Sequence, residues 1–215
     1  MARKRVAILI SGRGSNMTAL IEAAKDPAYP AEIVLVFTNR PGVEGIKRAE
    51  AAGISTSIMS DANRSREDFE RVIDDALEAY RVDIVCLAGY MRLLTPGFVG
   101  RWQNRMLNIH PALLPAFKGL DTHARALAAG VKIHGATVHF VVPEMDSGPI
   151  VVQGAVPVLD NDNVETLAAR VLAIEHRIYP LALRLLAEDR VRVVDGRCII
   201  DGARNPPGSF IVPEI

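Results

Sequence analysis

The chain has few of the features that would tie it to a specialised environment. Its 215 residues include only two cysteines, Cys86 and Cys198, too few for a disulfide framework or a cysteine-based zinc site. Basic and acidic residues number 25 each, so a net charge of zero gives no overall attraction to nucleic acid or an acidic membrane. No apolar run is long enough to span a membrane, and residues 6–10 are too short for a signal peptide. We therefore expect a protein of the reducing cytoplasm, with no membrane or nucleic-acid partner.

What the chain does have is a globular composition and enough length for a sizeable core. Apolar, β-branched runs predict buried strands, and runs with helical spacing stand between them. The predicted strands are 5–10, 32–39, 54–59, 82–89 and 106–109, and the predicted helices are 15–26, 42–53 and 65–80. This alternation predicts a mostly parallel, Rossmann-like α/β sheet with helices on both faces. Ligands of such sheets bind beyond the carboxyl ends of the strands.

The pattern changes in the C-terminal half. Residues 133–142 and 149–158 each alternate between apolar and other residues, which predicts an antiparallel hairpin beside the parallel sheet. A helix is expected over about 163–187, followed by a small hairpin on the Asp-Gly turn within 190–200. The tail from residue 205 contains two adjacent prolines and is expected to be irregular.

The sequence SGRGSN, residues 11–16, separates the first predicted strand from a helix. Such a glycine-rich turn leaves backbone N–H groups free at the positive end of the helix dipole, which makes an anion site. The dinucleotide fingerprint is incomplete, because Met17 stands in place of a third glycine and no acidic residue ends the second strand. The Gly-Lys-Ser/Thr of a P-loop is also missing, so the loop favours a monophosphate. The alternative is a tight turn in which Ser15 and Asn16 only cap the helix.

A second set of polar residues stands at the end of the strand over 106–109. Asn108 and His110 lie on the same side of the chain there, since side chains alternate along a strand. A donating amide and a protonated imidazole suit the stabilisation of an oxyanion. Asp146 is in the turn of the predicted hairpin, and a carboxylate beside an imidazole would favour its charged form and orient it. The alternatives are a histidine that bonds a loop carbonyl and an aspartate that caps its own turn.

The other histidines are weaker candidates. His134 and His139 are separated by an odd number of positions on one predicted strand, so they face opposite sides and cannot share a metal ion. His123 is expected to begin a helix. We therefore predict no metal site.

Taken together, several stretches resemble one known family. In order, they are ISGRGSN, LAGYMRLL, LNIHPALLPAFKGLDTHARAL, HGATVHFV, DSGPI and IEHRIYP. They are similar to the phosphoribosylglycinamide formyltransferases, over about residues 5–190. NIHPALLP and DSGPI occur across the wider formyltransferase superfamily, whereas SGRGSN and EHRIYP point to the glycinamide ribonucleotide branch.

The resemblance implies transfer of a formyl group from 10-formyltetrahydrofolate to the amine of glycinamide ribonucleotide, in purine biosynthesis, with no metal required. It implies a catalytic trio of Asn108, His110 and Asp146. It implies that Gly14, Ser15 and Asn16 hold the ribosyl phosphate and Glu175 the glycinamide end. The folate side would be lined by Arg66, Met91, Arg92, Leu93, Leu94, Val142, Pro143, Glu144 and Met145. The chain would be one domain, 1–215, with a phosphate-binding half (1–105), a catalytic and folate-binding half (106–190) and a C-terminal hairpin and tail (191–215).

Three other functions stay open at this stage. A formyltransferase for another amine, such as that of methionyl-tRNA, would carry an extra nucleic-acid-binding domain, and nothing after residue 190 is long or basic enough for one. A hydrolase of 10-formyltetrahydrofolate would carry an N-terminal regulatory domain, whereas the first strand here begins near residue 5. A non-catalytic nucleotide-binding module would need none of Asn108, His110 and Asp146. An apolar edge strand could make a homodimer, but the sequence does not choose the face.

Overall fold

A computed structural model of the chain describes residues 2–60, 62, 64–204, 208 and 211–213. Seven strands form one sheet in the order β3-β2-β1-β4-β5-β6-β7. They are β1 (Lys4–Ile10), β2 (Ala31–Thr38), β3 (Thr56–Ile58), β4 (Ile84–Leu87), β5 (Met106–His110), β6 (Ile133–Phe140) and β7 (Ile150–Pro157). The pairs from β3 through β5 are parallel, and β6 and β7 are added antiparallel. A separate antiparallel pair is formed by β8 (Val191–Val194) and β9 (Arg197–Ile200).

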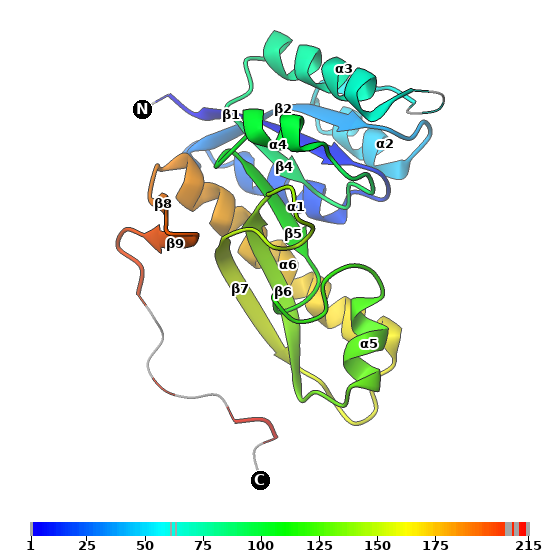
Figure 1. The fold of residues 1–215 in the computed structure, drawn as a ribbon, viewed down its shortest axis with the longest axis vertical. Coiled ribbons are helices and arrows are strands. Elements are labelled where there is room, and N and C mark those ends of the chain that lie inside the picture. The colour runs from blue at the N-terminus through cyan, green and yellow to red at the C-terminus, as the bar shows by residue number, and fades with distance from the viewer. Residues whose placement is uncertain (1, 61, 63, 205–207, 209–210, 214–215) are drawn as a thin grey trace.

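Within the described residues, six helices connect the strands, and they lie on both faces of the sheet (Figure 1). They are α1 (Ser15–Ala24), α2 (Glu44–Ala51), α3 (Arg66–Ala79), α4 (Pro96–Arg101), α5 (Thr122–Ala128) and α6 (Val164–Ala187). The longest, α6, begins with a capping box in which Asn163 and Thr166 exchange side-chain-to-backbone hydrogen bonds. None of the helices in the described part of the chain is long and apolar enough to cross a bilayer.

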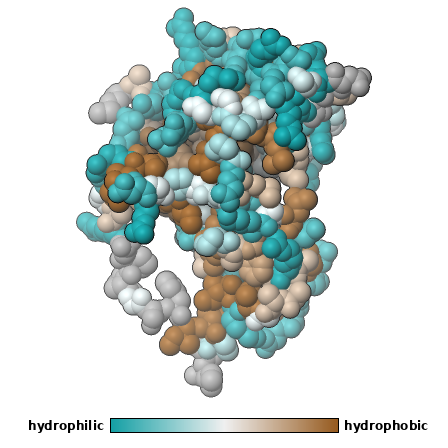
Figure 2. All heavy atoms as spheres, in the orientation of Figure 1, coloured by the Kyte–Doolittle hydropathy of each residue, from teal (hydrophilic) through white to brown (hydrophobic). Residues whose placement is uncertain are grey.

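The core has two layers, one on each face of the sheet. On β1, Val6, Ile8 and Ile10 pack with α1, α2 and α6, whereas the intervening Ala7 and Leu9 pack with α3 and α4. All five of these side chains are fully buried, which explains why the strand is apolar without alternation. On the outside, the face drawn in Figure 2 is mainly hydrophilic in its upper part, where α3 lies, and shows more hydrophobic atoms towards its middle and lower end.

The order of the strands defines one functional edge. The chain runs outward from β1 through β2 to β3 and then returns to the other side of β1 as β4. The strand order therefore reverses between β1 and β4, and ligands of open α/β sheets bind at the carboxyl end of such a point. The loop after β1 and the end of β5 both lie at this edge, because these strands are parallel and separated only by β4.

The predicted fold class is confirmed, as are the β6–β7 hairpin and the small β8–β9 hairpin on its Asp-Gly turn. The sequence reading missed α4, a helix of six residues that includes Pro96, Gly97 and Gly100. Thr95 begins it, with a side chain that accepts the Phe98 N–H. Most of the tail from residue 205, predicted to be irregular, lies outside the described residues.

Candidate active site

The loop after β1 is shaped by two glycines that allow backbones to approach closely. Gly14 has a φ of 73° and stands at the N-cap position of α1, which has no side-chain cap. Gly45, in the first turn of α2, donates its N–H to the Gly12 carbonyl. A Cβ atom on Gly45 would lie 2.4 Å from Ile10 Cδ1 and 2.9 Å from the Gly12 oxygen. The loop thus presents free N–H groups at the start of α1, as an anion site requires.

Asn16 and Glu175 join this loop to α6. The Asn16 amide donates to a Glu175 carboxylate oxygen at 2.6 Å, across 159 positions of sequence. Glu175 is only 6% exposed, and this burial raises the pKa of its carboxyl group while the bond from Asn16 lowers it. The two residues that the family resemblance assigns to one substrate therefore touch. Ser15 and Asn16 do not cap α1, so the plain capping interpretation of the loop is wrong.

Asn108 and His110 stand at the end of β5, at the centre of the same edge. Their strand pairs with β6, which places Asn108 opposite His139 and His110 opposite Thr137. Thr137 on β6 holds the chain that follows His110. Its hydroxyl donates to the Ala112 carbonyl and accepts the Leu114 N–H. Hydrogen bonds from the neighbouring strand therefore hold the segment after His110, which contains Pro111 and Pro115.

Asp146 reaches this pair from the turn between β6 and β7. Its φ is 52°, and its Oδ2 accepts the Gly119 N–H at 2.8 Å and lies 3.4 Å from His110 Nδ1. The turn is tight, because a Cβ atom on Gly148 would lie 1.7 Å from the Phe140 carbonyl oxygen. The carboxylate and the imidazole are both almost fully buried, with 10% and 7% of their side chains exposed. Residues 36 positions apart in sequence thus come together as the sequence analysis predicted.

The other nitrogen of His110 has a partner of its own. Nε2 lies 3.0 Å from the Phe117 carbonyl oxygen, which can only accept, so this nitrogen carries a proton. Both sequence interpretations of His110 therefore apply to it. One side of the ring bonds a loop carbonyl, and the other faces a carboxylate.

The structure adds His139, which the sequence analysis set aside. Its Nδ1 lies 2.8 Å from the Phe140 carbonyl and must donate to it, so Nε2 of the neutral ring is an acceptor. That nitrogen lies 3.2 Å from Asn108 Nδ2 and 3.8 Å from Asp146 Oδ1. Burial lowers the pKa of His139, although the Phe140 carbonyl and Asp146 act in the opposite direction. A neutral His139 fixes the orientation of the Asn108 amide and leaves the second amide N–H for another acceptor.

The residues expected on the folate side come from three places: the segment after β4, the turn that carries Asp146, and the start of α3. Met91 and Leu93 are each 55% exposed and Met145 is 54% exposed, which leaves apolar side chains open at the edge. The Arg92 guanidinium lies over the Phe69 ring, 4.6 Å from its centroid. Val142, Pro143 and Glu144 lead into the Asp146 turn, where Glu144 pairs with Lys118 at 3.7 Å. Arg66 is exposed at the first residue of α3, and its side chain has no described contact with the trio.

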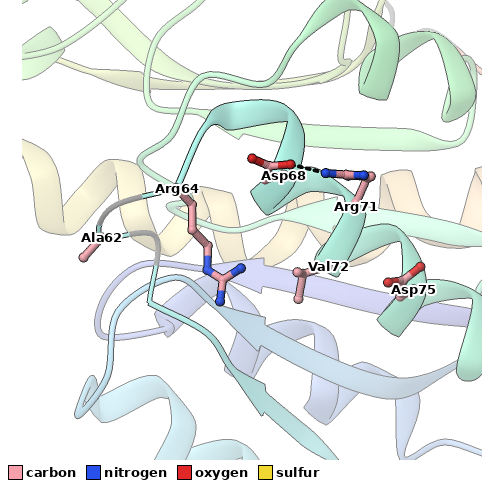
Figure 3. A pocket seen from close by; sticks show the side chains of 6 residues that line it. All are labelled: Ala62, Arg64, Asp68, Arg71, Val72 and Asp75. Carbon is pink, nitrogen blue, oxygen red and sulfur yellow. Dashed lines mark hydrogen bonds and ion pairs between the residues drawn. The ribbon is translucent and has the colours of Figure 1, made fainter.

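A surface hollow of the described part of the chain lies elsewhere, beside α3. It measures about 640 Å³ and is lined by Ala62, Arg64 and the α3 residues Asp68, Arg71, Val72 and Asp75 (Figure 3). Its Asp68 and Arg71 side chains pair with each other, as the dashed line shows. Within the described residues, no cluster of three histidine, cysteine or acidic side chains is arranged to hold a metal ion.

Comparison with known proteins places this geometry in context. A family model described as "Formyl transferase" matches residues 4–183. The chain belongs to the formyl transferase family. A formyl transferase named phosphoribosylglycinamide formyltransferase, from Escherichia coli (strain K12), is 41% identical over 210 residues, which are 97% of this chain and 99% of that protein. A crystal structure of the protein of the same name from Brucella melitensis is 56% identical and superposes with a TM-score of 0.83, over 86% of this chain and 96% of that one.

The family also includes domains of larger proteins. The trifunctional purine biosynthetic protein adenosine-3 of Gallus gallus is 50% identical over 190 residues, which are 88% of this chain. This formyl transferase chain spans only 19% of the length of that relative.

Proposed function

We propose that this chain transfers the formyl group of 10-formyltetrahydrofolate to the amine of glycinamide ribonucleotide, giving formylglycinamide ribonucleotide and tetrahydrofolate. The observation that carries the proposal is the convergence of Asn108, His110 and Asp146 at the carboxyl edge of the sheet. The similarity to a phosphoribosylglycinamide formyltransferase over nearly the whole of both chains supports the choice of substrates.

In the proposed reaction, the amine nitrogen attacks the formyl carbon and the carbonyl oxygen becomes an oxyanion. The free N–H of the Asn108 amide donates to that oxygen, since the other N–H is held by His139. His110 contributes its Nε2–H when the oxyanion replaces the Phe117 carbonyl as acceptor. Preorganised donors of this kind lower the barrier because they are oriented before the charge develops.

Asp146 supports the same step from the other side of the ring. Its carboxylate lies 3.4 Å from His110 Nδ1 and orients the ring for this donation. As the new C–N bond forms and the bond to the folate nitrogen breaks, one proton must pass from the amine to the leaving nitrogen. Asp146 relays it through water. The trio supplies all the groups that this transfer needs, so we propose that no metal takes part.

The binding residues divide between the two substrates. Gly14, Ser15 and Asn16 hold the ribosyl phosphate at the start of α1, and Glu175 orients the glycinamide end. The folate lies against Arg66, the segment 91–94 and the loop 142–145, where exposed apolar side chains meet the edge. We further propose that residues 1–215 act as one domain, with the halves 1–105 and 106–190 serving phosphate binding and catalysis, in the cytoplasm and without nucleic acid.

The experiment is to follow the conversion of 10-formyltetrahydrofolate to tetrahydrofolate by absorbance, with and without glycinamide ribonucleotide. Conversion that depends on the ribonucleotide supports the proposal. Conversion without it would identify a hydrolase of the formyl-folate. No conversion in either reaction would favour another amine acceptor, or a nucleotide-binding module without catalysis.

A further inference from the structure

Two buried side chains hold the two ends of segment 91–94, in which Met91 and Leu93 are exposed. At one end, the Met91 N–H donates to Ser11 Oγ at 2.9 Å. At the other, the Thr95 N–H donates to Glu70 Oε1 at 2.6 Å, and the Thr95 hydroxyl bonds the second oxygen of the same carboxylate. Ser11 is 4% exposed and Glu70 is 2% exposed. A segment with exposed apolar side chains is thus held in place by hydrogen bonds to buried polar side chains.

The two anchors differ in what else they hold. Ser11 is the first residue after β1 and begins the loop 11–16. Its hydroxyl donates to Asn39 Oδ1 at 2.7 Å, just after β2, and its N–H donates to the Gly89 carbonyl after β4. One hydroxyl therefore joins three strand ends. Glu70 lies on α3 and holds the segment from that helix alone.

We propose that Ser11 is a positioning residue that couples the two substrate sites, so that binding of one substrate raises the affinity for the other. The proposal rests on the proposed function, which places the phosphate on loop 11–16 and the folate on segment 91–94. The Ser11 hydroxyl belongs to loop 11–16 and accepts a hydrogen bond from Met91 of segment 91–94. A displacement of either the loop or the segment therefore strains this hydrogen bond. A ligand that fixes one loop therefore favours the bound position of the other.

The test measures the dissociation constant of tetrahydrofolate, the reaction product, by anaerobic titration with and without saturating glycinamide ribonucleotide. No transfer can occur in this mixture, so the ratio of the two constants reports coupling alone. We expect a ratio of about five or more in the unaltered protein. In Ser11→Ala the ratio should fall to about one. A ratio of one in the unaltered protein, or an unchanged ratio in Ser11→Ala, would overturn the proposal.

Glu70→Ala is the informative comparison, since it releases the other end of the same segment. It should weaken tetrahydrofolate binding both with and without the ribonucleotide and leave the ratio as in the unaltered protein, and Glu70→Gln should restore binding. A role of Ser11 in folding alone would give the same pattern as Glu70→Ala and would contradict coupling. A ratio of about one in Glu70→Ala as well would mean that the coupling between the two sites does not depend on Ser11 in particular, and it would also overturn the proposal.

Two further variants keep the result interpretable. Tyr29→Phe removes another internal hydroxyl bond, the one at 2.7 Å to the Pro180 carbonyl, at the opposite edge of the sheet, and should retain the ratio. If Ser11→Ala does not fold, as judged by circular dichroism, Ser11→Cys replaces it, because a thiol keeps the shape and accepts hydrogen bonds poorly. Ribonucleotide-dependent turnover by the unaltered protein is measured first, so a failure of the proposed function is recognised separately from a failure of coupling.

Discussion

Two loops of the candidate site, the one after β1 and the turn between β6 and β7, are built by different means. The loop after β1 offers backbone N–H groups, and its shape depends on the close approach of Gly45 to Gly12. The turn between β6 and β7 offers one side chain, the Asp146 carboxylate, at the centre of the trio. The first loop should therefore respond most to changes of packing, and the second to changes of chemistry. Substitutions in each region can separate these two dependences.

The largest effect is expected at the turn. Asp146→Asn keeps the shape of the side chain but removes the charge beside His110 Nδ1, so turnover should fall by about 10² to 10³, the typical cost of losing one electrostatic contribution to an oxyanion site. Steady-state kinetics with both substrates saturating would measure it. Asp195→Asn, the same change at another residue of positive φ in the β8–β9 turn, is the matched control and should leave turnover unchanged. Near-normal turnover in Asp146→Asn would remove Asp146 from the trio.

The next largest effect is expected from a substitution that changes the packing of the loop after β1. Gly45→Ala places a methyl group against Ile10 and the Gly12 carbonyl, so the loop must move, and the KM for glycinamide ribonucleotide should rise by about tenfold to a hundredfold. The KM for the formyl donor should change much less. Gly100→Ala in α4, where an added Cβ meets nothing within 4 Å, should leave both values unchanged. Equal increases in both KM values for Gly45→Ala would mean that the two loops do not serve separate substrates.

A smaller effect is expected at the side chain that supports the same loop. Glu175→Gln keeps a partner for Asn16 but removes the charge that would orient the amine end of the ribonucleotide, so the KM for this substrate should rise about tenfold. Glu165→Gln, on the exposed first turn of the same helix, is the control. An unchanged KM in Glu175→Gln would place the amine elsewhere.

The smallest effect concerns stability and pH. Burial, with the nearby His123, lowers the pKa of His134 from 6.5 to about 4. Between these values the unfolded chain binds a proton that the folded chain does not, so the contribution of His134 to stability is complete above pH 6.5 and declines as the pH falls towards 4. One such proton accounts for at most about 1.4 kcal/mol per pH unit. Thermal denaturation at several pH values should show that the stability of His134→Gln declines less steeply with falling pH than that of the unaltered protein. An identical decline in both proteins would mean that His134 does not contribute to the pH dependence of stability.

Some parts of the fold and of the candidate site could be predicted from the sequence, and others could not. The buried strands could be predicted because β1 and β4 are apolar on both faces, and Asn108 and His110 could be paired because they share one side of a strand end. The trio that includes Asp146 was implied by the family resemblance. The short helix α4 was not evident, since Pro96, Gly97 and Gly100 oppose helix formation and its stability comes from packing. His139 was set aside because the sequence posed only the question of a shared metal ion. Its place opposite Asn108 depends on strand register, which one sequence does not reveal.

The edges of the large sheet have a consequence for association between molecules. Exposed edge strands offer unpaired backbone groups to other chains and are a common origin of aggregation. Here one edge strand, β3, has only three residues, and the other, β7, ends in a proline and has β9 beside it. A short edge and a flanked edge offer little continuous backbone for pairing. We therefore expect crowded or partly unfolded copies of this chain to add strands to one another poorly at either side of the sheet.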